Sequence, residues 1–100
     1  MEKQLLDKRE AVGYLCQKYG VTKMQAFGSA VTGGFDPDTS DYDFLVFWRS
    51  DVERPSKAHL GLWEELKELF GRDVDLVNDS AIRNPFFAKA ARSEAVPYYG

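Results

Sequence analysis

The stretch that decides the fold is Asp41–Trp48, which reads DYDFLVFW near the middle of the chain. Aromatic and aliphatic residues dominate it, and this composition predicts a β-strand over 41–48. After Phe44 the stretch is apolar on both faces, which is typical of a central, buried strand. Two shorter segments, 23–27 and 73–77, have patterns that predict further strands.

Helices are predicted on either side of these strands. Residues 2–19 carry one apolar stripe at helical spacing and end at Gly20, and the stripe consists of Leu5, Val12, Leu15, Cys16 and Tyr19. A second helix is predicted over 55–70, ended by Gly71, and its expected buried stripe consists of Leu60, Trp63, Leu66, Leu69 and Phe70. Cys16 has no partner cysteine, so a buried thiol is expected.

The remaining segments are a loop and a third helix. Residues 33–40 are rich in turn formers and predict a loop, whereas Asn84 and Pro85 begin a helix that runs to about 93–94. Pro97 is expected to end that helix and leave a short tail. The order of elements predicts one α/β (α+β) domain over residues 1–100, with helices packed on a small mixed sheet of about three to four strands.

The composition narrows the class of function. The chain has 44% hydrophobic residues, which excludes a disordered chain, and a net charge of −3, which argues against direct nucleic-acid binding. A single histidine excludes most His-dependent metal sites and hydrolytic triads. No apolar run approaches the roughly 20 residues of a membrane helix. A cytoplasmic protein without a signal peptide is therefore expected.

Two carboxylates begin the central strand. Asp41 and Asp43 are two residues apart, so they leave the same face of the strand. Carboxylates held side by side repel each other unless a cation lies between them, and Mg²⁺ is commonly held by one or two carboxylates and substrate phosphates. Taken alone, the Asp-x-Asp pattern more often marks a strand end with solvated aspartates than a metal site.

Two further signals lie on the flanking strands. Gly28 and Ser29 follow the first strand, and with Gly33 they form a Gly-Ser-x-x-x-Gly turn whose N–H groups can face an anion. Ser29 is expected to cap the helical turn, although an ordinary strand-to-helix turn has the same residues. Asp75 lies in an apolar strand, where it needs a partner. Asp73 has the same parity and is a rival.

Together these signals resemble a known family. The motifs Phe27-Gly28-Ser29, Asp41-Tyr42-Asp43 and Val74-Asp75-Leu76 are similar to those of minimal nucleotidyltransferases, the MNT-type domains of the DNA polymerase β nucleotidyltransferase superfamily. The similarity covers about residues 20–99. The combination is specific, whereas no single motif is.

The resemblance implies a site and a reaction. It implies that Gly28, Ser29 and Gly33 bind nucleotide phosphates, and that the three aspartates Asp41, Asp43 and Asp75 are catalytic and hold one or two Mg²⁺ ions. The implied reaction transfers a nucleoside monophosphate, AMP from ATP, to a hydroxyl of a partner protein. The implied biological role is that of the MNT antitoxin of a HEPN/MNT toxin–antitoxin pair.

Two alternatives follow from the same residues. Ala30, Val31 and Thr32 are neutral where relatives often carry a basic residue, so the metals or Arg49, Arg72 or Lys89 would have to meet the phosphate charge. The chain could instead be an inactive MNT-fold module that neutralises a toxin by complex formation. An aromatic patch drawn from Phe86, Phe87, Tyr98 and Tyr99 would suit a partner subunit or an oligomer.

Overall fold

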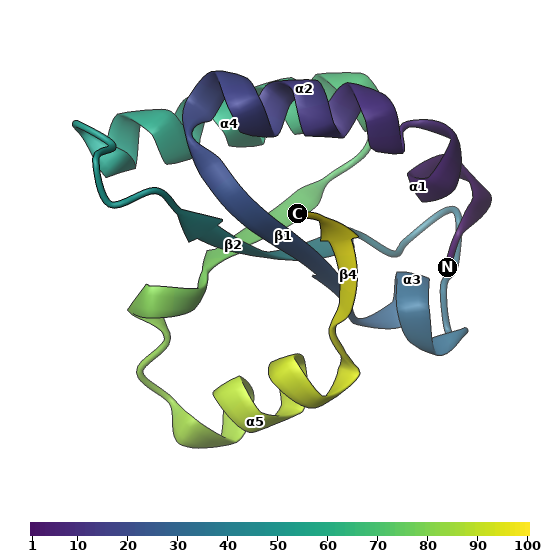
Figure 1. Ribbon diagram of the computed structural model, residues 1–100. Coiled ribbons are helices and arrows are strands. Elements are labelled where there is room, and N and C mark those ends of the chain that lie inside the picture. Colours follow the sequence, from purple (N-terminus) through teal and green to yellow (C-terminus); the bar gives the residue numbers. More distant parts are fainter.

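A four-stranded mixed sheet lies at the centre of the computed structural model, which describes residues 1–100 (Figure 1). The strand order is β3-β2-β1-β4; β2 runs parallel to β3, and β1 runs antiparallel to both β2 and β4. In chain order the elements are α1 (Lys3–Asp7), α2 (Arg9–Tyr19), β1 (Val21–Phe27), α3 (Ser29–Thr32), β2 (Tyr42–Trp48), α4 (Pro55–Phe70), β3 (Val74–Asn78), the 3₁₀ turn η1 (Asp79–Ala81), α5 (Pro85–Glu94) and β4 (Val96–Tyr99).

The two faces of the sheet are covered differently. Helices α2 and α4 lie together over one face, whereas α5 lies alone on the other side (Figure 1). The α2/α4 face holds a cluster of 16 buried residues, which includes Tyr42, Phe44 and Val46 of β2. The α5 face holds a cluster of only three, Phe27, Leu45 and Ala91. The α+β fold class and the central position of β2 are therefore confirmed.

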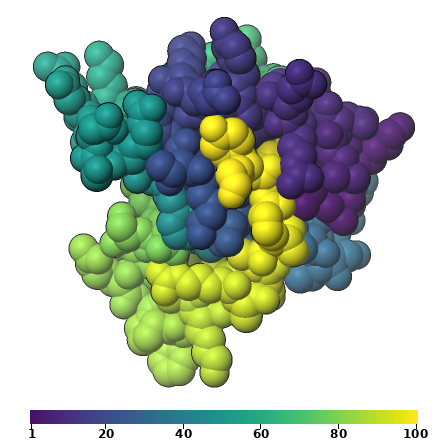
Figure 2. Space-filling model, in the orientation of Figure 1, coloured from purple at the N-terminus to yellow at the C-terminus, as the bar shows by residue number.

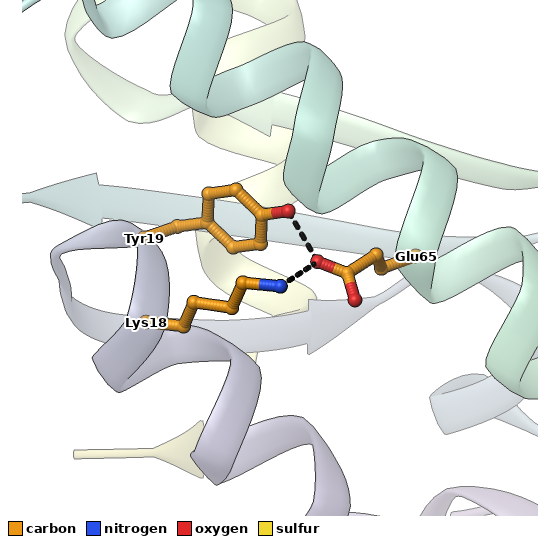
Figure 3. Close-up of polar contacts among 3 residues, drawn as sticks. All are labelled: Lys18, Tyr19 and Glu65. Atoms are coloured by element: carbon orange, nitrogen blue, oxygen red, sulfur yellow. Dashed lines mark hydrogen bonds and ion pairs between the residues drawn. The ribbon is translucent and has the colours of Figure 1, made fainter.

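A polar cluster joins the two helices of the thick layer. Glu65 of α4 accepts hydrogen bonds from the Tyr19 hydroxyl and from Lys18 Nζ, the latter at 3.0 Å (Figure 3). Nearby, a Cβ on Gly61 would lie 2.8 Å from the Tyr19 ring, so the absence of a side chain there lets the helices approach closely. Burial raises the pKa of the Cys16 thiol to about 12, which fits the predicted buried cysteine.

The helix predictions need two corrections. The segment 2–19 is two helices, because the chain bends at Lys8 (φ −103°, ψ 10°) and α1 turns toward α3, where Glu2 N–H donates to Ala30 O at 3.1 Å. In α4 the buried residues are Leu62, Leu66 and Phe70, one turn apart, whereas Leu60 is 52% exposed. The predicted buried stripe is therefore wrong at its first position, where Leu62 and not Leu60 is buried.

The predicted C-terminal tail is a strand. β4 pairs with β1, with Val96 opposite Ala26 and Tyr99 opposite Met24. Pro97 is tolerated because β4 is an edge strand, where a missing N–H leaves no ladder bond unmade. Tyr98 is buried and its hydroxyl donates to Leu5 O. In Figure 2 the yellow strand fills the surface between β1 and the purple N-terminal helices.

Arg9 completes the packing of β4. Its Nε donates to Tyr98 O at 2.7 Å and its Nη2 donates to Pro97 O at 3.2 Å. The aromatic patch expected at the C-terminal end is thus divided: Tyr98 lies inside, whereas Phe86 is 84% exposed and Phe87 is 41% exposed. None of the helices has the length and apolar character needed to cross a bilayer.

Candidate active site

The candidate site lies on the thinly covered face of the sheet. Along β2 the side chains of Tyr42, Phe44 and Val46 point into the α2/α4 cluster, so Asp43 lies on the opposite face with Leu45. Asp41, two residues earlier, has the same parity. The prediction that both aspartates share one face follows from this alternation, and the structure adds that the face is the one that α5 covers.

The strand register brings Asp75 to Asp43. In the parallel ladder Asp43 lies directly opposite Asp75, one strand spacing or about 4.8 Å away. Asp73 instead precedes β3, and its main-chain carbonyl accepts from Tyr42 N–H at 3.3 Å. The register thus decides between the two rivals: Asp75 is the neighbour of Asp43.

Gly28 forms the other wall of this site. Phe27 is the register partner of Asp43 on the antiparallel side, so Gly28 comes directly beside that carboxylate. A Cβ built on Gly28 would overlap Asp43 Oδ2 and lie 3.1 Å from Cγ. The backbone at Gly28 has φ 77° and ψ −156°, a conformation that is essentially restricted to glycine. Only glycine fits this close approach.

Ser29 and Gly33 frame the short helix α3. Ser29 is its first residue and Gly28 is the N-cap, so the prediction that Ser29 caps the turn is wrong. Instead Gly28 O accepts from Val31 N–H and Thr32 N–H, both at 3.0 Å. The Ser29 hydroxyl is left without a partner in the chain, because α3 already begins at Ser29 and Gly28 occupies the N-cap position. Gly33 ends α3 with φ 96°.

The carboxylate of Asp43 is repelled by the negative charges around it. Burial, followed by the negative charges of Asp75, Asp41 and Glu94, raises the pKa of the Asp43 carboxyl to about 6. Asp43 makes no ion pair with any basic residue. A bound cation would offset the repulsion at this half-buried carboxylate and favour its ionised form.

The donor set fits a hard divalent cation that is also held by its substrate. No group of three or more acidic, histidine or cysteine side chains is arranged to enclose an ion by itself. Mg²⁺ commonly takes only one or two carboxylates and completes its shell with water and substrate phosphates. Asp43 and Asp75 on neighbouring strands are suited to that sharing, whereas Asp41 is near enough for its charge to act on Asp43 but does not close a three-carboxylate site with them.

The basic candidates lie in three different environments. Arg49 lies six residues beyond Asp43, about 20 Å along β2, and pairs with Asp51 at 3.2 Å. Lys89 is exposed and lies two residues from both Phe87 and Ala91, so it faces away from the sheet. Of the three, only Arg72 shares a pocket with a candidate aspartate, Asp41, and its Nη1 donates to Ser40 O at 3.1 Å.

One acidic neighbour was missed from the sequence. Glu94 is the last residue of α5 and one of the charges that act on Asp43. Nothing local marks it, because its position depends on how α5 packs back over the sheet through the Phe27–Phe87 ring contact, with centroids 6.3 Å apart. Two surface hollows of about 710 Å³ each lie elsewhere, one of them between α2 and α4, and neither is lined by any of the three candidate aspartates.

The sequence matches a known domain family over most of its length. A family model described as a nucleotidyltransferase domain matches residues 8–98. The chain belongs to the nucleotidyltransferase domain family. A structure described as a minimal nucleotidyltransferase has 31% identity to this chain, a TM-score of 0.77, and coverage of 93% of this chain and 91% of the other. No curated protein matched the sequence.

Two solved structures with lower sequence identity share the fold. A chain of a toxin–antitoxin complex with AMP-PNP has 19% identity and a TM-score of 0.73, covering 92% of this chain and 73% of its own. A chain from the Shewanella oneidensis complex of tri-AMPylated HEPN toxin with MNT antitoxin has 16% identity and a TM-score of 0.68, covering 96% of this chain and 72% of its own. The predicted resemblance to the MNT type is confirmed.

Proposed function

We propose that this chain is a single-domain, Mg²⁺-dependent nucleotidyltransferase that transfers AMP from ATP to a hydroxyl of a partner protein. The observation that carries the proposal is the geometry at Asp43: Asp75 lies opposite it in a parallel ladder, and the bare backbone of Gly28 lies against it. Such a site can hold a metal–phosphate group between carboxylates and a glycine turn.

The reaction assigns a task to each residue. Asp41 and Asp43 would hold Mg²⁺, which would neutralise phosphate charge. Gly28 and Ser29 receive the phosphates through main-chain N–H groups and the free Ser29 hydroxyl, and Gly33, whose N–H donates to Ser29 O, ends the phosphate-binding turn. The acceptor oxygen bonds to the α-phosphorus, the bond to the bridging oxygen breaks, and pyrophosphate leaves. Asp75 takes the hydroxyl proton as the base.

The partner is proposed from the structural neighbours. Two of them come from toxin–antitoxin complexes, one with AMP-PNP and one with a tri-AMPylated HEPN toxin. We infer that this chain acts in the cytoplasm as the antitoxin of a HEPN toxin and modifies that toxin. The exposed rings of Phe86 and Phe87, on the same side of the sheet as the aspartates, suit a partner that brings its hydroxyl to an open site.

Calorimetric titration of ATP tests the site. We expect binding with Mg²⁺, its loss in EDTA, and its loss in the double variant Asp41→Ala/Asp43→Ala. The matched control, Asp51→Ala/Glu53→Ala, removes the same charge beyond the other end of β2, from exposed positions, and should bind normally. Equal binding in both double variants would refute the site assignment.

Transfer of label from ATP to a co-purified HEPN partner tests the chemistry. Asp75→Ala should reduce turnover far more than ATP affinity, whereas Asp73→Ala, on the same face but outside the Asp43 pair, should change either by less than about threefold. No ATP binding at millimolar concentration, together with a stable partner complex, would favour the inactive binding module instead.

A further inference from the structure

Arg72 has an unusual setting just after α4. Its guanidinium carbon lies 4.9 Å from the Phe35 ring centroid and 5.1 Å from that of Tyr42, and those two rings are themselves stacked at 5.2 Å. Its Nη1 donates to Ser40 O at 3.1 Å, and its Nε is buried without a partner. The planar cation is thus fixed by two aromatic rings and one carbonyl.

This arginine makes no ion pair, although acidic residues surround it. Asp38, Asp41 and Asp73 line the same polar pocket, of about 340 Å³, yet none of them lies within ion-pair distance of the guanidinium. The contact that Arg72 does make is to the main chain of Ser40, the residue before Asp41. Its geometry therefore favours a role in holding the chain over a role in neutralising one carboxylate.

Asp41 needs such an anchor, unlike the other two aspartates. Asp43 and Asp75 lie inside paired strands, where the ladder fixes their positions. Asp41 precedes β2, has no ladder partner and is exposed. It follows a loop closed on itself, in which Ser40 N–H donates to Asp36 O at 2.8 Å and Asp36 N–H donates to Ser40 Oγ at 2.9 Å.

The chain is consequently held on both sides of Asp41. Ser40 is held by Arg72, and Tyr42 is held by its N–H bond to Asp73 O. We propose that Arg72 is a positioning residue for nucleotidyl transfer, which acts through Ser40 to fix the carboxylate of Asp41 beside Asp43. The expected effect on nucleotidyl transfer rests on the proposed function, whereas the anchoring of Asp41 by Arg72 does not depend on that function.

Conservative variants separate positioning from charge. Arg72→Lys keeps the charge but loses the flat stack and the fork, and Phe35→Leu keeps Arg72 but removes one ring. The control is Arg54→Lys, at the other end of α4 and about 24 Å away along the helix. Melting curves show whether each variant is folded. If Arg72→Lys does not fold, the readouts on Phe35→Leu test the positioning role instead.

Three readouts are measured on these variants. Hydrogen exchange at the amides of Ser40 and Tyr42 should accelerate about tenfold in Arg72→Lys and Phe35→Leu, because the free energy of local opening of this segment would be lower. Mn²⁺ affinity with ATP present, read from the EPR signal of free ion, should fall about tenfold. In transfer assays the Mg²⁺ requirement should rise and kcat should fall about tenfold, with the KM for ATP changed by less than about twofold.

Two results would overturn the positioning role of Arg72, and a third would separate it from the proposed transfer reaction. Exchange and Mn²⁺ affinity equal to those of Arg54→Lys would overturn the positioning role. A raised KM for ATP with an unchanged Mg²⁺ requirement would also overturn it, because Arg72 would then be a phosphate ligand. If the unaltered chain shows no transfer to a partner but the exchange and Mn²⁺ results hold, the proposed transfer reaction fails while the anchoring of Asp41 stands.

Discussion

The two faces of the sheet have opposite characters. The α2/α4 side holds a cluster of 16 buried residues, to which both helices contribute, whereas the α5 side holds a cluster of three, one of them from α5. The candidate aspartates all belong to the thin face, and the Asp43 carboxyl there is half-buried among like charges. One face supplies most of the buried apolar surface, and the other holds groups that repel each other when no ligand is bound.

This division explains how so short a chain can contain an unfavourable site. A domain of this size has a net stability of only about 5–15 kcal/mol, so the repulsion among carboxylates must be offset elsewhere. The separation of the faces predicts that changes on the thick face reduce stability, whereas changes on the thin face alter ligand binding. Four variants test this, in order of decreasing effect.

The largest effect is expected from Phe44→Ala on the thick face. Phe44 is fully buried and contacts the rings of Phe70 and Tyr98, so the variant should lose about 3–5 kcal/mol of unfolding free energy. Urea unfolding followed by circular dichroism measures the loss. Phe86→Ala, which removes an 84% exposed ring on α5, is the control and should stay within about 0.5 kcal/mol.

Gly28→Ala tests the close approach on the thin face. The glycine-only backbone and the overlap with Asp43 should together cost about 2–3 kcal/mol and abolish metal-dependent ATP binding. Gly33→Ala is the matched control, since Gly33 also has a positive φ but a Cβ there would meet no atom within 4 Å, and it should cost about 1 kcal/mol. Similar losses for both would mean that the Asp43 contact is unimportant.

Asp43→Asn should stabilise the chain when no metal is present. Because the pKa of Asp43 rises from 3.8 to about 6 on folding, the folded state holds its proton more tightly, and stability falls as pH rises between these values. Removing the charge should add about 1 kcal/mol near neutral pH, after allowance for partial exposure, and almost nothing near pH 4. Melting temperatures in EDTA at the two pH values measure the difference.

Added Mg²⁺ and ATP should reverse that order at neutral pH. The unaltered chain gains stability from ligand binding and Asp43→Asn does not. If Asp43→Asn were no more stable than the unaltered chain in EDTA, the predicted repulsion at Asp43 would be contradicted.

The smallest effect is expected from Ser29→Ala. The Ser29 hydroxyl has no partner in the chain, so its removal should leave the melting temperature unchanged and weaken ATP binding by about 1 kcal/mol or less, one hydrogen bond to phosphate. Calorimetry measures the binding, and Thr32→Ala, which loses a local bond to Gly28 O at 3.2 Å, serves as the control. Unchanged affinity would remove Ser29 from the proposed phosphate site.

Much of this architecture was predictable because its signals are local. The composition of 41–48 indicated the central strand, helical periodicity indicated α2 and α4, and alternation placed Asp41 and Asp43 on one face. The family assignment rested on the same motifs, and the match over residues 8–98 confirms it. The roles of the individual site residues stay predictions.

The rest depended on contacts between distant parts of the chain. β4 was missed because four residues containing Pro97 have no strand signal until β1 provides a partner. Alternation could not decide between Asp73 and Asp75, because the choice is a matter of register between β2 and β3. Glu94 and Arg72 gained their positions only when α5 and the end of α4 packed near the site.

The way in which β4 is held has a consequence for self-association. Edge strands can pair with strands of other molecules and so begin aggregation. Here the edge strand contains Pro97, which has no N–H to donate, and two of its carbonyls already accept from Arg9. At this edge the sheet offers few main-chain groups to a second chain, so Arg9→Ala should promote fibril growth on prolonged incubation rather than impair the aspartate site.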